Sequence, residues 1–347
     1  MKTIKLFIVL LCLAGISKAD SPPQFSLLWS EYPSWSTFGV ANDLKLIDGD
    51  AGKLGEIEKK YGVDIVLKLA EYDPCLTMYA ANQADAVCAT NVDILNIALK
   101  RPSVAILATS TSYGADAVLV TPDIKTVEDL QKYPIYGLPK TVSEYMVARN
   151  IEIKGLNPAD FPLVNMDPGV AAIAMQQKKN DQKAIVVWNP FVLQTLNQRK
   201  DVKVLFDSTQ IKGEIIDMVV MSEDSLKRPG ADNAAKAICE AFYQINKRIE
   251  HPSTQDDTLI ALGEKFSSLT LQNMRQVVRQ TVFYKTPSDG TTLFTSADLP
   301  QTMQKVVNTC AKLEFLPKDQ IPVIGFGNNY QTKTHLRFDP QYMQSLK

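Results

Sequence analysis

Short apolar runs alternate with amphipathic segments from residue 25 to residue 221. The runs are rich in β-branched residues and predict strands, whereas segments with an apolar position every three or four residues predict helices. Such alternation is typical of α/β proteins, in which helices cover both faces of a mostly parallel sheet. Strands are predicted at residues 25–29, 63–69, 86–90, 104–108, 117–120, 135–138, 163–164, 184–188, 202–206 and 217–221.

The order of these elements predicts two lobes. The strand at 117–120 carries the chain into a second region, and the strand at 217–221 leads it back. After Gly230 the pattern is helical, which predicts a helical C-terminal tail. Ligands bind at the carboxyl ends of the strands in open α/β sheets, so the crevice between the lobes is the expected binding site. We expect one lobe from residues 20–116 and 217–347 and the other from residues 117–216.

The start of the chain resembles a secretory signal peptide. Lys2 and Lys5 precede an apolar run at 6–16, and the small residues Ser17 and Ala19 suit a cleavage site. An uncleaved anchor is the alternative, but this run is too short to span a bilayer stably. We therefore expect residues 1–19 to be removed and the mature protein to be periplasmic, with no direct membrane insertion.

The charge balance excludes some classes of partner. The chain has 37 Lys and Arg against 38 Asp and Glu, a formal net charge of -1. Loss of Lys2, Lys5 and Lys18 with the leader would leave a mildly acidic protein. Nucleic-acid binding needs a basic stripe, and an anionic membrane surface attracts basic segments, so neither partner is expected. We expect a monomer without a cofactor or a bound metal.

The cysteines leave two interpretations open. Export permits disulfides, and Cys75 with Cys88 is the favoured pair if one forms. A chain of this size has a core that needs no covalent staple, so buried free thiols are equally compatible. The spacing is not that of a zinc or redox motif. The cysteines that remain after cleavage are Cys75, Cys88, Cys239 and Cys310.

Several short motifs over residues 27–196 resemble one family of transport proteins. The sequence is similar to the binding proteins of ABC importers for alkanesulfonates, taurine, nitrate and thiamine pyrimidine precursors. This resemblance implies a type II-like, two-lobed periplasmic-binding-protein fold that captures a small molecule and delivers it to a permease and its ATPase, without catalysis. The matching residues are Tyr79, Ala84-Asp85-Ala86-Val87, Thr90-Asn91, Asp93, Asp129-Leu130, the helix start at 141–144, Gly155-Leu156-Asn157-Pro158 and Val186-Val187-Trp188-Asn189-Pro190-Phe191.

Two segments are similar to the branch of this family that is linked to urea or guanidine degradation. They are Thr90-Asn91-Val92-Asp93 and the C-terminal Leu336-Arg337-Phe338-Asp339-Pro340 with Tyr342. The segment at 109–116 departs from that branch. The resemblance therefore implies uptake of a nitrogen-containing compound and leaves its identity open.

Polar and aromatic residues gather at the predicted strand ends, where they would line the crevice. Acids outnumber bases there, and Lys140 is the only nearby base, so the pocket favours a cation over a sulfonate or nitrate. Aromatic faces add cation–π attraction, which suits a guanidinium or an amine. A neutral amide or pyrimidine comes next, and an alkanesulfonate, taurine or nitrate remains the alternative. The candidate ligand-binding residues are Tyr32, Trp35, Asp73, Asn91, Asp93, Ser110, Thr111, Thr141, Ser143, Glu144, Trp188 and Asn189.

Some of these residues also have a purely structural interpretation. Asp73 before Pro74 is a candidate helix N-cap, and Thr141 with Glu144 has the spacing of a capping box. Asn91 is expected to cap the following helix, and Asp93 suits the positive end of a helix dipole.

An enzyme is the alternative of a different class. A fungal thiamine pyrimidine synthase has the same fold, but it needs a pocket histidine and a cysteine-rich run. His251 and His335 both lie in the C-terminal region, and no cysteine cluster is present. The sequence also lacks the nucleophile elbow and the zinc-protease motif. A binding module that serves a membrane sensor would use the same pocket chemistry.

Overall fold

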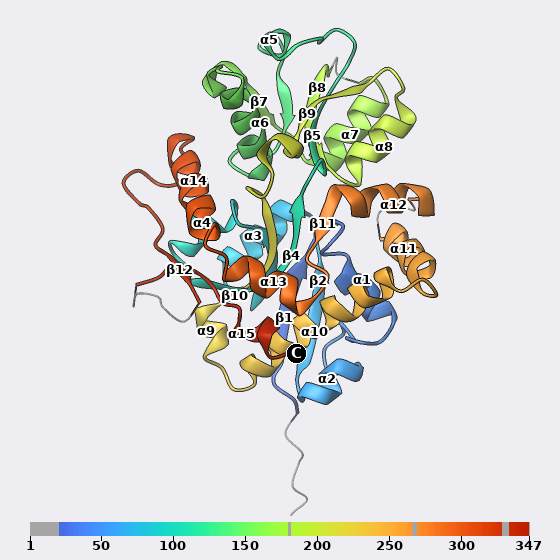
Figure 1. Ribbon diagram of the computed structural model, residues 1–347, viewed down its shortest axis with the longest axis vertical. Coiled ribbons are helices and arrows are strands. Elements are labelled where there is room, and N and C mark those ends of the chain that lie inside the picture. The colour runs from blue at the N-terminus through green and yellow to red at the C-terminus, as the bar shows by residue number, and fades with distance from the viewer. Residues whose placement is uncertain (1–20, 180–181, 266–268, 328–332, 347) are drawn as a thin grey trace, which may run out of the picture.

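The computed structural model describes residues 21–179, 182–265, 269–327 and 333–346. The predicted signal peptide, residues 1–19, lies outside these ranges. Figure 1 shows two lobes stacked along the long axis of the molecule, each built around its own sheet with helices on its faces. The prediction of a two-lobed α/β fold is confirmed.

Lobe 1, the lower lobe in Figure 1, contains a sheet of eight described strands. Their order is β12-β13-β4-β10-β3-β1-β2, and β11 pairs with β4 outside this path. The strands are β1 (Gln24–Trp29), β2 (Asp64–Leu69), β3 (Ala86–Thr90), β4 (Ser103–Ser112), β10 (Ile216–Ser222), β11 (Thr281–Phe283), β12 (Ile324–Phe326) and β13 (Leu336–Phe338). The helices are α1 (Thr37–Asp43), α2 (Glu56–Tyr61), α3 (Tyr72–Ala80), α4 (Ile94–Ala98), α9 (Glu223–Leu226), α10 (Ala231–Glu250), α11 (Gln255–Glu264), α12 (Leu271–Gln280), α13 (Pro287–Phe294), α14 (Leu299–Lys312) and α15 (Gln341–Gln344).

Lobe 2 contains a sheet of five described strands in the order β7-β6-β8-β5-β9. Gly137 at the end of β6 permits a close approach to β8, because a Cβ atom there would lie 2.3 Å from Val186 Cγ1. The strands are β5 (Asp116–Val120), β6 (Ile135–Gly137), β7 (Leu163–Asn165), β8 (Ala184–Trp188) and β9 (Lys203–Asp207). The helical segments are α5 (Val127–Leu130), α6 (Val142–Ile153), η1 (Pro158–Asp160), α7 (Pro168–Gln176), α8 (Phe191–Gln198) and η2 (Ser208–Ile211).

Both sheets are mixed, whereas the sequence predicted mostly parallel ones. The exceptions include the two strands that follow a crossing between the lobes: β5 is antiparallel to β8 and β9, and β10 is antiparallel to β3 and β4. Each of them starts at the junction of the lobes and runs away from it. The amino ends of β5 and β10 therefore meet the carboxyl ends of the neighbouring strands at the junction.

The C-terminal region is less helical than the sequence predicted. Helix α12 ends at Gln280, because residues 281–283 pair as β11 with the carboxyl end of β4. Two further short strands, β12 and β13, extend the sheet beside β4. The last long helix, α14, rises beside α6 of lobe 2 (Figure 1), and an ion pair joins Lys312 to Glu152 of α6.

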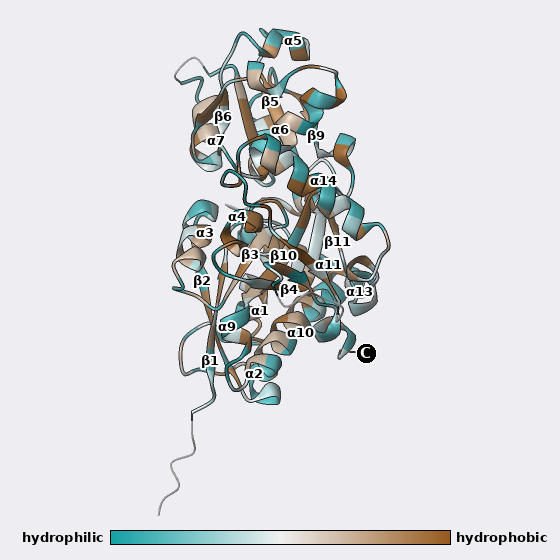
Figure 2. Ribbon diagram, turned by 90° about the vertical axis from the view of Figure 1, so that its left-hand side faces the viewer, coloured by the Kyte–Doolittle hydropathy of each residue, from teal (hydrophilic) through white to brown (hydrophobic). Residues whose placement is uncertain are grey.

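The apolar residues that predicted the strands form the cores. Strands β3, β5, β8 and β10 are buried along their whole length, and Figure 2 shows hydrophobic strands between more hydrophilic helices. Within the described ranges, no helix has both the length and the hydropathy needed to cross a membrane. The four cysteines in these ranges are free and buried, so the structure has no Cys75–Cys88 disulfide.

Candidate binding site between the lobes

A small cavity lies at the junction of the two lobes. The space in which the centre of a water molecule can lie has a volume of about 10 Å³, so the cavity holds roughly one water. The lobes are therefore closed against each other. The cavity is lined by Tyr32, Trp35, Tyr72, Thr90, Asp116, Val142, Trp188, Ile215 and Asp217.

Four aromatic rings form one wall of this cavity. The rings of Tyr32 and Trp35 lie 4.8 Å apart, and Trp35 stacks on Tyr72 with centroids 5.4 Å apart. Trp188, from β8 of lobe 2, meets Tyr72 of lobe 1 edge-on at 5.7 Å. Because the wall joins rings from both lobes, closure completes it. Such a wall offers negative ring faces to a cation.

Three aspartates are buried at the same place. Asp93, Asp116 and Asp217 are 8 %, 4 % and 1 % exposed, respectively. Asp217 Oδ2 accepts a 2.5 Å hydrogen bond from Ser110 Oγ. Asp93 accepts hydrogen bonds from Tyr72 Oη at 2.6 Å, from Thr90 Oγ1 at 2.8 Å and, across the junction, from the backbone N–H of Val142 at 2.8 Å.

Burial dominates the electrostatics of these carboxyl groups. It raises the pKa of Asp93 and of Asp116 to about 6, against the hydrogen bonds that favour the charged forms. Burial and the charge of Asp116 raise the pKa of Asp217 well above its usual value, although the Ser110 hydroxyl opposes the change. No Lys or Arg in the described part of the chain forms an ion pair with any of the three. A positive charge is therefore what this site lacks.

One polar atom of the aromatic wall, the buried Trp35 indole N–H, has no hydrogen-bond partner among the described residues. The Tyr32 hydroxyl lies near the Asp217 carboxylate and the Ser112 hydroxyl. A buried polar group without a partner costs free energy, and an indole nitrogen can only donate. A bound molecule with an acceptor could use the indole N–H.

The predicted site residues divide into those that line the cavity and those that support it. Tyr32, Trp35 and Trp188 line it. Asp93 lies behind Tyr72 and binds its hydroxyl. Asn91 does not cap a helix as predicted, since its side chain instead binds Glu214 O at 3.0 Å and the N–H of Ile216 at 2.9 Å, which fixes the second crossing.

Several other predicted residues hold the junction in shape. Ser110 lies between Ser34 and Asp217, and Thr111 donates to Ile215 O at 2.7 Å. In lobe 2, Thr141 is the N-cap of α6 and accepts a hydrogen bond from the N–H of Ser143. Asn189 Nδ2 reaches across the junction to Gln280 Oε1 at 2.9 Å. None of these four side chains from the predicted set, nor Ser143, lines the cavity.

Two acidic residues lie elsewhere, and their predicted capping roles are wrong. Helix α3 begins at Tyr72, before Asp73, so Asp73 is an exposed residue of the first turn and Glu71 occupies the N-cap position. Because α3 begins at Tyr72, this residue is the first of the helix and is buried, and its hydroxyl donates a hydrogen bond to Asp93. Glu144 accepts from the N–H of Lys140 at 2.6 Å, outside the capping-box pattern, and it lines a groove beside the end of α14.

Sequence reasoning missed Asp217 and did not select Asp116, although both line the cavity. A signal was present, because Asp217 is the single charged residue within an apolar stretch at 215–221. Asp116 likewise opens an apolar strand at the first crossing. Asp116 was expected near the crevice but was not selected as a ligand-binding residue, and Asp217 was missed because the crevice was expected at the carboxyl ends of strands, whereas both residues stand at the amino ends of the two crossing strands. His251 and His335 do not line the cavity.

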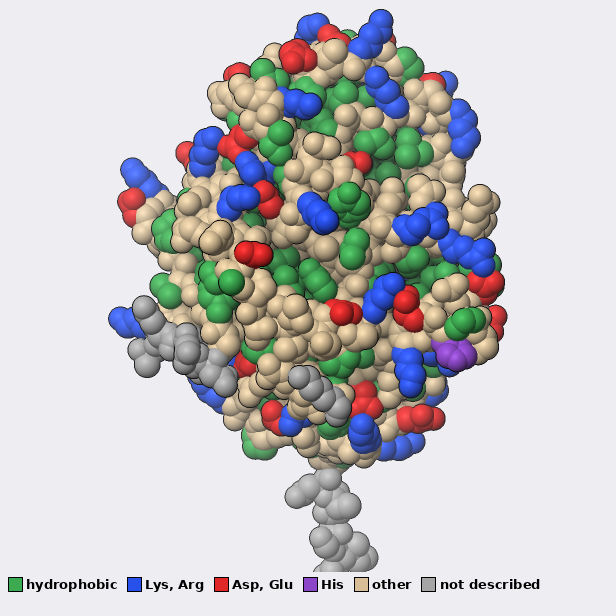
Figure 3. All heavy atoms as spheres, in the orientation of Figure 1, with side chains coloured by type: hydrophobic (Ala, Val, Ile, Leu, Met, Phe, Trp, Pro, Cys, Tyr) green, Lys and Arg blue, Asp and Glu red, His purple; other side chains and the backbone are tan. Residues whose placement is uncertain are grey.

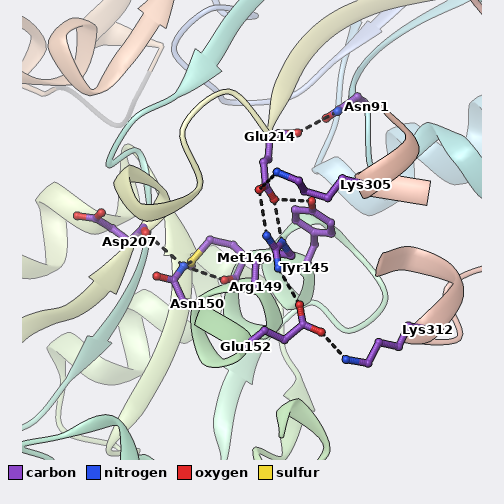
Figure 4. A network of polar contacts seen from close by, with 10 residues as sticks. All are labelled: Asn91, Tyr145, Met146, Arg149, Asn150, Glu152, Asp207, Glu214, Lys305 and Lys312. Atoms are coloured by element: carbon purple, nitrogen blue, oxygen red, sulfur yellow. Dashed lines mark hydrogen bonds and ion pairs between the residues drawn. The ribbon is translucent and has the colours of Figure 1, made fainter. Parts of the chain in front are cut away.

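A second acidic cluster at the junction is fully compensated by bases (Figure 4). Glu214, from the second crossing, accepts from Tyr145 Oη at 2.8 Å, Arg149 Nε at 2.9 Å and Lys305 Nζ at 3.1 Å. These contacts join α6 of lobe 2 to α14 of lobe 1. Burial opposes the charge of Glu214, but the three donors outweigh it and lower its pKa.

A larger hollow is a surface groove on lobe 1. It has a volume of about 860 Å³ and lies between α2, α10 and α13. Its charged residues include ion pairs, such as Lys60–Glu240 and Lys285–Glu250. Figure 3 shows that acidic and basic side chains are mixed over the face of the molecule drawn there. We favour the small junction cavity as the binding site because both lobes contribute to it and its carboxylates have no cationic partner.

Comparisons with known proteins place the fold. No protein-family model matches the chain, and no curated protein is similar to it in sequence. The structure is similar to the alkanesulfonate-binding protein SsuA from Xanthomonas axonopodis pv. citri bound to MOPS, with a TM-score of 0.69, 14% identity and coverage of 86% of this chain and 96% of that chain. It is also similar to the aliphatic sulphonate binding protein SsuA from Escherichia coli, with a TM-score of 0.66, 18% identity and coverage of 86% and 95%. The nitrate-binding protein NrtA from Synechocystis PCC 6803 follows with a TM-score of 0.57, 15% identity and coverage of 93% and 98%.

The chain has the periplasmic-binding-protein fold. The fold class predicted from the sequence is thus confirmed. In this fold the junction between the lobes is where the two sheets face each other, and the cavity with Asp116 and Asp217 lies there.

Proposed function

We propose that this protein is the solute-binding protein of an ABC importer and that it captures a small organic cation in the periplasm. The observation that carries the proposal is a cavity between the lobes that is lined by two buried carboxylates and four aromatic rings, without a Lys or Arg among its lining residues. A guanidinium or a small amine supplies the missing charge and N–H donors, and its face or edge contacts the rings.

The similar proteins are named for sulfonate and nitrate, which are anions. An anion in this cavity would face Asp116 and Asp217 at close range, and like charges in a buried site repel strongly. The similarity of fold supports transport as the role, and the charge of the cavity supports a different ligand class. The permease and its ATPase are the expected protein partners.

Binding is proposed to close the two lobes on the ligand, less tightly than in the structure, where the cavity holds roughly one water and is smaller than a guanidinium. Tyr32, Trp35 and Asp217 of lobe 1 receive the cation, and Asp116 and Trp188 of lobe 2 complete the enclosure. The two crossing segments, near residues 113–115 and 212–215, bend during the motion. A ligand that contacts both lobes shifts the population toward the closed form, which the permease recognises.

A thermal-shift screen of refolded, ligand-free protein tests the proposal. The panel contains guanidinium, methylammonium, urea, an aminopyrimidine, taurine, an alkanesulfonate and nitrate. A ligand at 100 times its dissociation constant stabilises the protein by roughly 2.7 kcal/mol. We expect a shift with the cations and its loss in Asp217→Asn, whereas Asp224→Asn, with a side chain 92% exposed, keeps the shift. A shift with the sulfonate or nitrate alone would overturn the proposed ligand class.

A further inference from the structure

Two groups of buried carboxylates at the junction differ in one respect. Glu214 has Arg149 and Lys305 as ion-pair partners, so its charge is balanced within the protein. Asp116 and Asp217 face a common cavity and have no such partner in the described chain. In the cavity, only a bound cation or a proton can balance the negative charge of Asp116 and Asp217.

We propose that the ligand-free site keeps a proton on the Asp116–Asp217 pair and releases it to solvent when a cation binds, so that capture weakens as the pH falls. The exchange is balanced: a neutral carboxyl group and a free cation give a carboxylate–cation pair and one proton in water. This inference deepens the proposed function and relies on it for the cationic nature of the ligand.

Among the described residues, the groups that act on Asp116 include no positive charge. The strand β4 presents the Ser112 hydroxyl, the end of β3 is followed by Asp93, and β9 ends in Asp207. All of these groups are neutral or acidic.

The surroundings of Asp217 have the same character. Ser110 of β4 donates a hydrogen bond to its carboxylate, and the neutral Tyr32 hydroxyl lies close to it. Burial raises the pKa of Cys88 of β3 and of Tyr284 after β11, and both groups are close enough for the charge of Asp217 to add to the change. Asp116 and Asp93 complete the set, and both repel a second negative charge.

The direction of the pH dependence follows from these surroundings. Burial raises the pKa of Asp116 from 3.8 to about 6 and that of Asp217 well above 3.8. Between about pH 4 and pH 6 the folded protein keeps a proton that the unfolded chain has lost, so the stability of the ligand-free protein falls as the pH rises through this range. Cation binding requires the charged carboxylates, so the affinity for the cation rises as the pH rises through this range.

Calorimetry with guanidinium as the probe tests the exchange. Titrations at pH 5.5 in two buffers with different ionisation enthalpies count the protons released. We expect about one proton per bound guanidinium and a dissociation constant that rises up to about tenfold for each pH unit below about 6. Binding without proton release, or with a constant that does not change from pH 8 to pH 5, would overturn the exchange.

A second measurement does not need a ligand. Urea unfolding of the ligand-free protein from pH 4.5 to pH 8 should show the fall in stability, and Asp217→Asn and Asp116→Asn should each flatten it. Asp224→Asn, at an exposed position, is the matched control and should follow the wild type. If the two junction variants keep the wild-type pH dependence, the proton is not on this pair. If they flatten it but guanidinium and methylammonium do not bind even at pH 8, the proton is confirmed and the proposed ligand class fails.

Discussion

Replacement of Glu214 by Gln removes the one negative charge that holds three donors at the junction. The side chain is 8% exposed and accepts from Tyr145, Arg149 and Lys305. Gln keeps one acceptor oxygen but leaves the charge of Arg149 with Glu152 as its remaining partner, at 2.8 Å. Breaking a buried ion pair from one side typically costs 3–5 kcal/mol, and the retained oxygen puts our expectation at about 3 kcal/mol.

The assay is urea unfolding of wild type and Glu214→Gln at pH 7.5 and at pH 3.5. The pKa of Glu214 is lowered by Arg149, Tyr145 and Lys305 despite burial, so its contribution is present above the unfolded value of 4.5 and is lost as the pH falls through the folded value. The difference between the two proteins should therefore shrink in acid. Equal stability at pH 7.5, or a gap that persists unchanged once Glu214 is protonated, would refute the reasoning. Asp224→Asn, which breaks only an exposed pair with Lys227, should change stability by less than about 1 kcal/mol.

Three further predictions follow from packing at single residues. Trp188→Ala should weaken guanidinium binding about tenfold by calorimetry, because it removes the lobe 2 ring of the aromatic wall, whereas Ile173→Ala, 52% exposed on the same lobe, should leave binding unchanged. Gly137→Ala should lower the free energy of unfolding by about 1–3 kcal/mol or more, since its Cβ would lie 2.3 Å from Val186 Cγ1; an unchanged melting temperature would contradict the close packing. In the chain without residues 1–19, the four thiols should resist thiol reagents while the protein is folded, because burial raises the pKa of each; they are Cys75, Cys88, Cys239 and Cys310. In urea without reductant all four should react, and two thiols that stay unreactive would reveal a disulfide.

The sequence predicts the fold well where apolar periodicity is strong. The buried strands β3 and β8 begin and end where the pattern predicts, because their flanking residues are polar or turn-forming. It fails for β11, where Thr281–Phe283 continues a helical pattern and only pairing with the distant β4 turns it into a strand. Tertiary pairing of this kind leaves no trace in local periodicity.

The candidate site is predicted in part. Tyr32, Trp35 and Trp188 were selected because they sit at strand ends and aromatic side chains often line small-molecule pockets, and all three line the cavity. Asn91, Thr111 and Asn189 look like ligand contacts in the sequence, yet in the structure they hydrogen-bond to groups at or across the crossings. Which of two polar residues faces a cavity depends on strand direction, and the antiparallel course of β5 and β10 decides it for Asp116 and Asp217.

The position of β10 has a consequence for how the chain assembles. It lies between β3 and β4 in space, but it follows the whole of lobe 2 in the chain. While the polypeptide emerges from its amino end, lobe 2 can complete its sheet from residues 116–207 before the central strand of lobe 1 has been added. Until then the edges of β3 and β4 that β10 will cover are unpaired, and such edges readily pair with other chains. In the nascent protein, the amino-terminal half is thus the part whose unpaired strand edges can pair with other chains, and lobe 1 is the last to become complete.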